Sequence, residues 1–236
     1  MALVDDLTSK VQELARERWE AIREGYVVPS GDSFTFGNTG VHLDATVLYA
    51  DIRGSTELVD SLPDTRAAEY YKAFLHCAAK VVKAEGGTIT AYDGDRLMAI
   101  FLGKTQANDA IRAALKISGA VADIINPQFL VFFGEKHCPF THTVGIDSGK
   151  LLTAKIGVRV DSDLVWVGAA ANYAAKLNSF DGLDGAYPIR ATERAIQRAG
   201  GLNCFTKRAD STSIWDGPYN NLACGPHFRT NINMDV

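Results

Sequence analysis

The sequence of 236 residues has 24 Lys and Arg against 28 Asp and Glu, a formal net charge of −4, and is 47% hydrophobic. This balance is typical of a globular protein and argues against a nucleic-acid-binding module. No apolar run reaches the roughly 18 residues of a membrane span, and the acidic start lacks the basic region of a secretory signal. Its four cysteines, none in a CxxC spacing, favour a reduced, cytoplasmic protein.

An amphipathic helix and an irregular arm begin the chain. Hydrophobic residues at three- and four-residue steps predict a helix over 3–24, which ends at the following Gly and Pro. This helix either dimerises with a second copy or lies on its own domain, and the sequence leaves both interpretations open. Residues 25–42 hold four glycines and are typical of a linker. We therefore expect an N-terminal helix and linker arm over 1–42 and one domain over 43–236.

The order of elements after residue 43 predicts an α+β fold. An apolar strand at 45–52 precedes two helices, the second over 64–85, and a hairpin that turns at Asp93-Gly94. The other predicted elements are a helix over 106–125, two strands meeting at Ser148-Gly149, a strand over 163–168, a helix over 169–180, and a short strand and helix reaching about 199. The order βαββαβ is that of a ferredoxin-like sheet, with helices expected on one face.

Two aspartates at strand ends are candidate metal ligands. Asp51 ends the strand at 45–52, and Asp95 follows the hairpin turn. A carboxylate at the end of an apolar strand is unfavourable unless something compensates its charge. If the two strands are neighbours, the carboxylates converge and form an oxygen site suited to Mg²⁺ or Mn²⁺. Two aspartates at such a separation are common, so the pair alone is weak support for a site.

Two other segments could bind a phosphorylated ligand. The turn Arg53-Gly54-Ser55-Thr56 opens a helix directly after Asp51, where free N–H groups could seat a phosphate; N-capping by Ser55 or Thr56 is the structural alternative. Asn172 and Lys176 share one face of a helix and suit a ribose oxygen and a phosphate. A solvated polar face would also account for this second pair.

Four segments, taken together in chain order, indicate one protein family. The chain resembles the class III nucleotidyl cyclase catalytic domain in VLYADIRGST, GGTITAYDGDRLMAIF, VGIDSGKLL and WVGAAANYAAKLNSF, over about residues 44–215. The resemblance implies that Asp51, Asp95 and the backbone carbonyl of Ile52 bind two divalent ions, Mn²⁺ or Mg²⁺. These ions would act on a nucleoside triphosphate.

The resemblance also implies roles for the other segments. The turn at 53–56 would bind the substrate phosphates, and Asn172 would orient the ribose. In this family the active sites are shared across a homodimer, in which one chain supplies the aspartates. The other chain supplies the base pocket and the helix of Asn172 and Lys176.

Several residues depart from the family pattern. Lys176 stands where the family has an arginine that stabilises phosphate charge, and Arg159 is a candidate for a second such charge. Ala91 and Val165 stand where purine cyclases carry side chains that hydrogen-bond the base. Neither can pair with a purine edge, so the usual purine recognition is lost. A degenerate pocket with relaxed selectivity is the alternative.

Two other departures suggest a pyrimidine base. Tyr49 and Arg96 offer donors for the carbonyl oxygens of uracil or cytosine, although core packing and a surface charge would also explain them. With these departures the chain looks like the bacterial pyrimidine cyclases of the Pycsar antiphage system. That resemblance implies synthesis of cyclic UMP or cyclic CMP, which a separate effector reads. Side chains that can donate a hydrogen bond to the base are clearer in this sequence than side chains that can accept one. This favours UTP over CTP.

Two rival functions remain open at this point. One is an adenylate or guanylate cyclase with an atypical base pocket. The other is a catalytically dead cyclase-like module that binds a nucleotide, and the intact Asp51, Asp95 and Asn172 argue against it. A diguanylate cyclase would need a GG[DE]EF-like hairpin, where this chain has Tyr92-Asp93-Gly94-Asp95.

Overall fold

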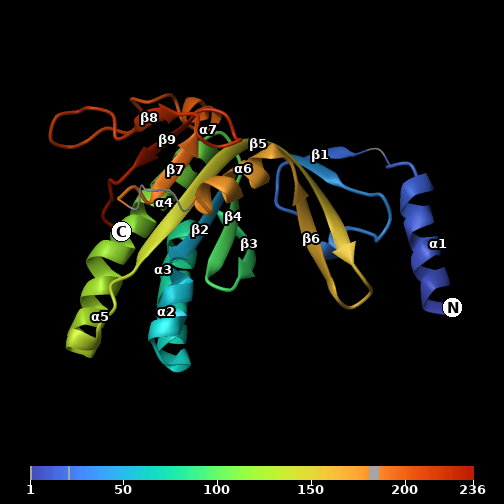
Figure 1. The fold of residues 1–236 in the computed structure, drawn as a ribbon. Coiled ribbons are helices and arrows are strands. Elements are labelled where there is room, and N and C mark those ends of the chain that lie inside the picture. Colours follow the sequence, from blue (N-terminus) through green and yellow to red (C-terminus); the bar gives the residue numbers. More distant parts are fainter. Residues whose placement is uncertain (1, 21, 181–185) are drawn as a thin grey trace.

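The computed structural model describes residues 2–20, 22–180 and 186–236. Its strands form one mixed sheet: β1 Arg23–Gly25, β2 Val41–Arg53, β3 Thr88–Asp93, β4 Arg96–Phe101, β5 Thr141–Gly157, β6 Ser162–Val167, β7 Ile189–Thr192, β8 Asp216–Tyr219 and β9 His227–Thr230. Its α-helices are α1 Ala2–Arg16, α2 Ser55–Ser61, α3 Asp64–Ala84, α4 Gln106–Gly119, α5 Asn126–Phe133, α6 Ala169–Asn178 and α7 Glu193–Arg198. Figure 1 shows their arrangement.

Four antiparallel strands in the order β3-β4-β2-β5 form the centre of the sheet. The helices α2 and α3 connect β2 to β3, and α4 lies between β4 and β5 in the chain. This is the ferredoxin-like order expected from the sequence, and the predicted α+β fold is confirmed. Strands β7, β9 and β8 extend the sheet beyond β5.

Alternation along β2 divides the core between two faces of the sheet. Leu48, Ala50 and Ile52 belong to the larger core with α3 and α4, and we call this the covered face. The alternate residues of β2, among them Val47 and Tyr49, lie on the other face, where α6 is the helix that contributes to the smaller core. We call this the open face. The expectation that the helices lie on one face is therefore wrong for α6.

Small residues allow α6 to approach the sheet closely. Its buried residues include Ala170, Ala171 and Ala174, and a Cβ at Gly145 of β5 would collide with the carbonyl oxygen of Ala174. Because only glycine fits at that point, a substitution there would push α6 away from the strand. The close contact fixes the end of α6 beside the carboxyl-terminal end of β2.

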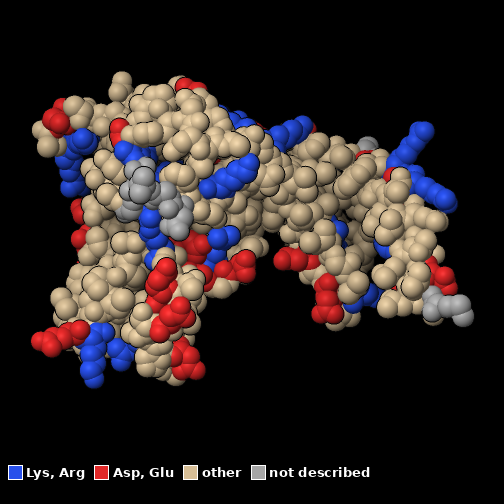
Figure 2. All heavy atoms as spheres, viewed as in Figure 1, with Lys and Arg blue, Asp and Glu red and all other residues tan. Residues whose placement is uncertain are grey.

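An arm projects from the body of the protein. Strand β5 is continuous over Thr141–Gly157, so the prediction of two strands about Ser148-Gly149 is wrong. Its first half pairs with β7, and its second half continues into the arm and pairs with β6. Figure 1 shows β1, β6 and α1 on this arm, and in Figure 2 the arm and the body border an open hollow.

The N-terminal segment differs from its prediction. The helix ends at Arg16 instead of continuing to residue 24, and residues 23–25 form β1, which pairs with the start of β2. Residues 25–42 therefore include β-structure as well as irregular backbone. The pairing of β1 with β2 joins this segment to the sheet.

The helix predicted over 106–125 is part of a longer one. After α4 the chain forms a π-helical segment, Ala120–Ile125, and continues as α5. The stretch Gln106–Lys136 is long and apolar enough to cross a membrane by length and composition alone. In the structure most of α4 is buried in the larger core, whereas none of the residues of α5 is buried.

Candidate active site

Asp51 lies near the end of β2 on the open face. It pairs with Thr143 of the neighbouring strand β5. On the other side of β2, Ala50 pairs with Leu97 of β4, so Asp51 lies beside Arg96 at the start of β4. The side chain is 16% exposed. The site is therefore built on the central strands of the sheet, which hold Asp51 in a fixed position.

The hairpin between β3 and β4 brings Asp95 to the same place. Asp93 pairs with Arg96, so Gly94 and Asp95 are the two turn residues, one position later than predicted. Gly94 has a φ of 61°, which glycine adopts without strain and which two-residue hairpin turns require. The predicted convergence of the two aspartates is present, because the charge of Asp95 acts directly on Asp51.

Arg96 joins this pair of carboxylates through Asp51. Its Nε and Nη2 atoms donate to Oδ2 of Asp51 at 3.0 and 2.9 Å. The other oxygen of Asp51, Oδ1, and Oδ2 of Asp95 are buried and have no hydrogen-bond partner among the described residues. Two orphaned carboxylate oxygens are what a hard divalent cation binds, so the residues fit Mg²⁺ or Mn²⁺.

The charges at this site compete with each other. Burial and the neighbouring charge of Asp95 raise the pKa of Asp51 to about 6, although Arg96 acts in the opposite direction. Burial also raises the pKa of Tyr49, so its phenol stays protonated at neutral pH. The site therefore disfavours its own negative charge, and a bound cation would relieve that cost.

A pocket of about 420 Å³ opens in front of Asp51. Its walls come from the end of β2, the start of α2, Arg96 of β4, and the end of α6 with the residues that follow it. Ile52, predicted to bind metal through its backbone carbonyl, lines this pocket, and so does the whole turn Arg53-Gly54-Ser55-Thr56, predicted to bind phosphates. Gly54 has a φ of 71° and caps α2, and neither Ser55 nor Thr56 caps it as the structural alternative required.

Asn172 and Lys176 lie outside this pocket. Both are on the exposed side of α6, and Lys176 donates to the carbonyl oxygen of Ala223 at 3.2 Å. The residues of α6 and its end that do line the pocket are Asn178, Ser179 and Phe180. The chain therefore does not bring Asn172 and Lys176 to its own aspartates.

The predicted base-reading residues fall into two groups. Tyr49 and Ala91 pack against the same small core on the open face, with Met98 paired to both. Val165 pairs with Ala154 in the arm, and Arg159 is exposed in the turn between β5 and β6. Of these four residues, none lines the Asp51 pocket, which includes Arg96.

Sequence reasoning missed the polar end of α6. Nη2 of Arg96 donates to the hydroxyl oxygen of Ser179 at 3.4 Å. The surrounding hydrogen-bond network assigns the amide nitrogen of Asn178 to the side of the sheet, where it donates to the carbonyl oxygens of Thr143 and Tyr49 at 2.9 and 3.2 Å. These contacts tie α6 to the strands that bear Asp51. The only signal in the sequence was their position at the end of the predicted helix 169–180.

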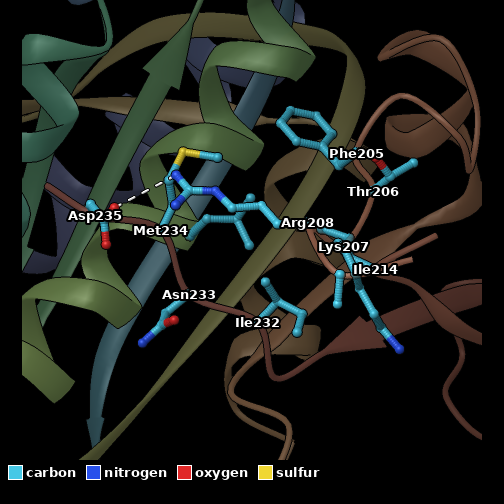
Figure 3. A pocket seen from close by; sticks show the side chains of 11 residues that line it. Phe205, Thr206, Lys207, Arg208, Ile214, Ile232, Asn233, Met234 and Asp235 are labelled. Carbon is cyan, nitrogen blue, oxygen red and sulfur yellow. Dashed lines mark ion pairs between the residues drawn. The ribbon is translucent and has the colours of Figure 1, made fainter. Parts of the chain in front are cut away.

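Another pocket, of about 430 Å³, lies under the C-terminal segment. Figure 3 shows its lining of apolar and polar side chains, among them Arg208 and Asp235, which form an ion pair. Nη2 of Arg208 and Oδ2 of Asp235 are 3.6 Å apart. It contains none of the residues predicted to bind substrate or metal. We therefore place the candidate active site at Asp51 and Asp95.

Comparisons with known proteins find nucleotide cyclases among the relatives of this chain. No protein-family model matches the sequence. The chain is 48% identical to a uridylate cyclase of Xanthomonas perforans over 180 residues, which are 76% of this chain and 78% of that protein. It is 46% identical to a uridylate cyclase of Burkholderia cepacia over 217 residues, 91% of each chain.

Solved structures show the same fold at lower identity. The adenylyl cyclase CyaB from P. aeruginosa matches with a TM-score of 0.66 and 20% identity, covering 81% of this chain and 95% of that one. The guanylyl cyclase Cya2 matches with a TM-score of 0.65 and 19% identity, covering 83% of this chain and 95% of that one. The resemblance to class III cyclases is thus confirmed, and the chain belongs to the uridylate cyclase family.

Proposed function

We propose that this protein converts UTP to 3′,5′-cyclic UMP and pyrophosphate. The observation that carries the proposal is the pair of orphaned carboxylate oxygens of Asp51 and Asp95 beside a pocket lined by Arg53 to Thr56. The two uridylate cyclases with 46% and 48% identity support the choice of substrate. In the reaction the ribose 3′-oxygen bonds to the α-phosphorus, the bond to the pyrophosphate oxygen breaks, and the 3′-hydroxyl loses its proton.

Metal binding supports this chemistry. When bound, two divalent ions, Mn²⁺ or Mg²⁺, favour ionisation of the 3′-hydroxyl and neutralise charge on the triphosphate. Asp51 and Asp95 hold them, with the backbone carbonyl of Ile52 as a further oxygen. Arg96 contacts Oδ2 of Asp51, so Oδ1 is the oxygen that would bind a metal ion, and the guanidinium lies in the pocket that would hold the substrate. The turn Arg53-Gly54-Ser55-Thr56 binds the phosphates in this arrangement.

The active unit in this proposal is a homodimer with shared sites. Its support is the position of Asn172 and Lys176 on the exposed side of α6, outside the pocket of their own chain. In the dimer, Asn172 orients the ribose and Lys176 stabilises phosphate charge in the partner's site. Arg159 and Val165, which lie on the projecting arm, also reach the site of the partner, where Arg159 adds positive charge.

Base selection in the proposal follows from shape and hydrogen bonding. Ala91 and Val165 cannot pair with a purine edge, whereas Tyr49 and Arg96 donate to uracil carbonyl oxygens.

The biological role that fits is synthesis of a signal in antiphage defence. In this role the protein acts in the cytoplasm, binds no nucleic acid or membrane, and makes a product that a separate effector reads. An atypical adenylate or guanylate cyclase is the alternative.

One incubation tests the substrate. Pure protein with Mn²⁺ and equal concentrations of the four ribonucleoside triphosphates should yield mainly cyclic UMP, identified by chromatography against standards. The same incubation with EDTA should yield none. Cyclic CMP as the main product would move the assignment to CTP, and cyclic AMP or cyclic GMP would replace the pyrimidine assignment with the alternative.

Mixed dimers test the sharing of sites. Asp51→Ala and Asn172→Ala chains should each be inactive alone, because each damages both sites of its homodimer. After subunit exchange, a heterodimer has one site with both changes and one site with neither, so part of the activity should return. If exchange is verified by differently tagged chains and no activity returns, the shared site is wrong.

A further inference from the structure

A further pocket, of about 260 Å³, lies on the covered face of the sheet. His142 of β5 lines it and pairs with Ile52 of β2, which belongs to that face. The other walls come from the end of α4, the π-helical segment Ala120–Ile125 and the C-terminal segment. None of the described residues that line it is Asp, Glu, Lys or Arg. It therefore differs from the Asp51 pocket, whose walls include acidic and basic side chains.

A buried serine and a buried histidine form the inner wall of this pocket. Ser118 of α4 and His142 are 6% and 5% exposed, and Oγ of Ser118 lies 2.8 Å from Nε2 of His142 in a hydrogen bond. Burial lowers the pKa of His142 to about 4, so the ring is uncharged at neutral pH. Its other nitrogen, Nδ1, has no hydrogen-bond partner among the described residues. A polar ligand in the pocket would supply that partner.

The C-terminal segment forms the rim of the pocket and is held in place by the end of α4. The backbone N–H of Met234 donates to the carbonyl oxygen of Leu115 at 3.1 Å, and a Cβ at Gly119 would collide with the carbonyl oxygen of Met234. Only glycine therefore allows the segment to cross α4 at this point. The crossing places the exposed amides of Asn231 and Asn233 at the rim, where they offer both donors and acceptors.

The helix that forms another wall is locally distorted. Residues Ala120–Ile125 are π-helical, and Val121 and Ala122 of this segment line the pocket. The side-chain amide of Asn126, which follows the segment, exchanges hydrogen bonds of 3.0 and 3.2 Å with the backbone of Phe140, another lining residue. Short π-helical segments are rare and occur frequently at functional sites. The distortion is thus a second, independent observation that favours a ligand here.

We infer that this pocket is a second ligand site, which binds an uncharged nucleoside. Val121, Phe140 and Pro188 give it apolar surface for a flat ring, and its imidazole and amide groups form hydrogen bonds with ring nitrogens and carbonyl oxygens. A phosphate is poorly suited to it, because burying that charge without a basic partner is unfavourable. The inference goes beyond the proposed function, since the charge of UTP and of cyclic UMP makes both unsuited to this pocket.

The two pockets lie on opposite faces of the same pair of strands. His142 of β5 pairs with Ile52 of β2 on the covered face, and the neighbouring residues Thr143 and Asp51 pair on the open face. Thr143 lines the Asp51 pocket, so adjacent residues of one strand line the two pockets. A ligand that contacts His142 therefore acts on the strand beside Asp51, and we expect its binding to change the turnover of UTP.

Binding to the full chain without metal tests the site. Uridine, cytidine, adenosine and guanosine are offered one at a time in saturation-transfer NMR, with the four 5′-monophosphates as charged controls. At least one nucleoside should bind with a dissociation constant below about 10 mM, and its monophosphate should bind at least about tenfold more weakly.

Three tryptophan variants locate the bound nucleoside. Ala122→Trp fills this pocket from its rim and should abolish binding. Ile124→Trp, on the same π-helical segment but outside the lining, is the matched control and should bind normally. Ser179→Trp fills the Asp51 pocket instead and should also bind the nucleoside normally. All three positions are exposed, so the fold should tolerate the changes.

Four results would overturn the inference. Absence of binding by all four nucleosides to the unmodified chain would reject the site, and so would equal binding by Ala122→Trp and Ile124→Trp. Loss of binding in Ser179→Trp but not in Ala122→Trp would place the nucleoside in the Asp51 pocket. Equal binding of a nucleoside and its monophosphate would reject the preference for an uncharged ligand.

Turnover tests the link between the two pockets. At a saturating concentration of the bound nucleoside, kcat/KM for UTP should change at least about fivefold in the unmodified protein and stay constant in Ala122→Trp. An unchanged kcat/KM in the unmodified protein would reject the link, and equal changes in both proteins would show that the nucleoside acts in the Asp51 pocket. If UTP is not turned over at all, the proposed function fails while the binding measurements still decide the site.

Discussion

The two faces of the central sheet differ in how they are covered. On the covered face, α3 and α4 exclude water from Leu48, Ala50 and Ile52, and the core is continuous. On the open face α6 buries only part of the sheet, so Tyr49 and Asp51 lie at the edge of the smaller core, and Asp51 faces a pocket. The same strand, β2, supplies both sets of side chains.

The residues on the two faces therefore have different roles: one set stabilises the fold, and the other forms the candidate active site. Residues on the covered face are apolar and fully packed, so they stabilise the sheet without meeting a ligand. Asp51 on the open face has a raised pKa and an oxygen atom without a hydrogen-bond partner among the described residues, which are costs that packing alone does not explain. Substitutions of site residues on the open face should therefore lower activity more than stability. Substitutions on the covered face should lower stability more than activity.

Asp51→Ala should have the largest effect of any single change on the open face. Loss of a metal ligand should lower kcat/KM for UTP at least about 10³-fold, or about 4 kcal/mol. The melting temperature should stay the same or rise, because a partly desolvated charge is removed. Asp44→Ala, an exposed aspartate of the same strand, is the control and should keep full activity. Near-normal turnover by Asp51→Ala would remove the metal site from this face.

Ile146→Ala should show the opposite signature. Ile146 of β5 is fully buried on the covered face, and large-to-small changes at such positions typically cost about 2–5 kcal/mol. We expect a loss of about 3 kcal/mol in the free energy of unfolding, measured with urea, while kcat/KM of the folded enzyme changes less than about twofold. A large fall in kcat/KM at full folding would mean that the two faces are coupled.

Local patterns were sufficient to predict the covered face and most elements. Alternation in β2 and the stripe of α3 predicted which residues are buried, and the glycine turn correctly indicated the hairpin that carries Asp95. The break at Ser148-Gly149 was wrong because β2 pairs without interruption along residues 141–153 of β5. Long-range pairing overrides a local turn signal, and a single sequence does not contain that pairing.

The arrangement of the site was less accessible to sequence reasoning. The aspartates and the turn at 53–56 are near one another in strand order, so their meeting could be predicted. The ion pair of Arg96 with Asp51 depends on the register of β2 and β4, and Ser179 comes from the end of a helix on the open face. Neither contact leaves a periodic pattern in the sequence.

Arg96→Ala sharpens the role of the open face in base selection. If the guanidinium binds uracil, kcat/KM for UTP should fall at least about tenfold, or about 1.4 kcal/mol, while turnover of ATP does not fall. If Arg96 acts only by pairing with Asp51, turnover of all four triphosphates should fall by the same factor. Competition assays with paired nucleotides distinguish these results, and Arg96→Lys shows how much of the effect is charge.

The pH dependence of metal binding should give the smallest and most specific effect. With a pKa of about 6, Asp51 is half protonated at pH 6, whereas an ordinary aspartate would stay ionised to about pH 4. Mn²⁺ affinity, measured by electron paramagnetic resonance, should therefore be about twofold lower at pH 6 than at pH 8 and fall about tenfold per unit below pH 6.

Because the pKa of Asp51 is raised in the folded state, the metal-free fold loses stability as the pH rises through about 6. Saturating Mn²⁺ should then raise the melting temperature more at about pH 8 than at about pH 5, and an affinity that is flat across that range would show that Asp51 is not a ligand.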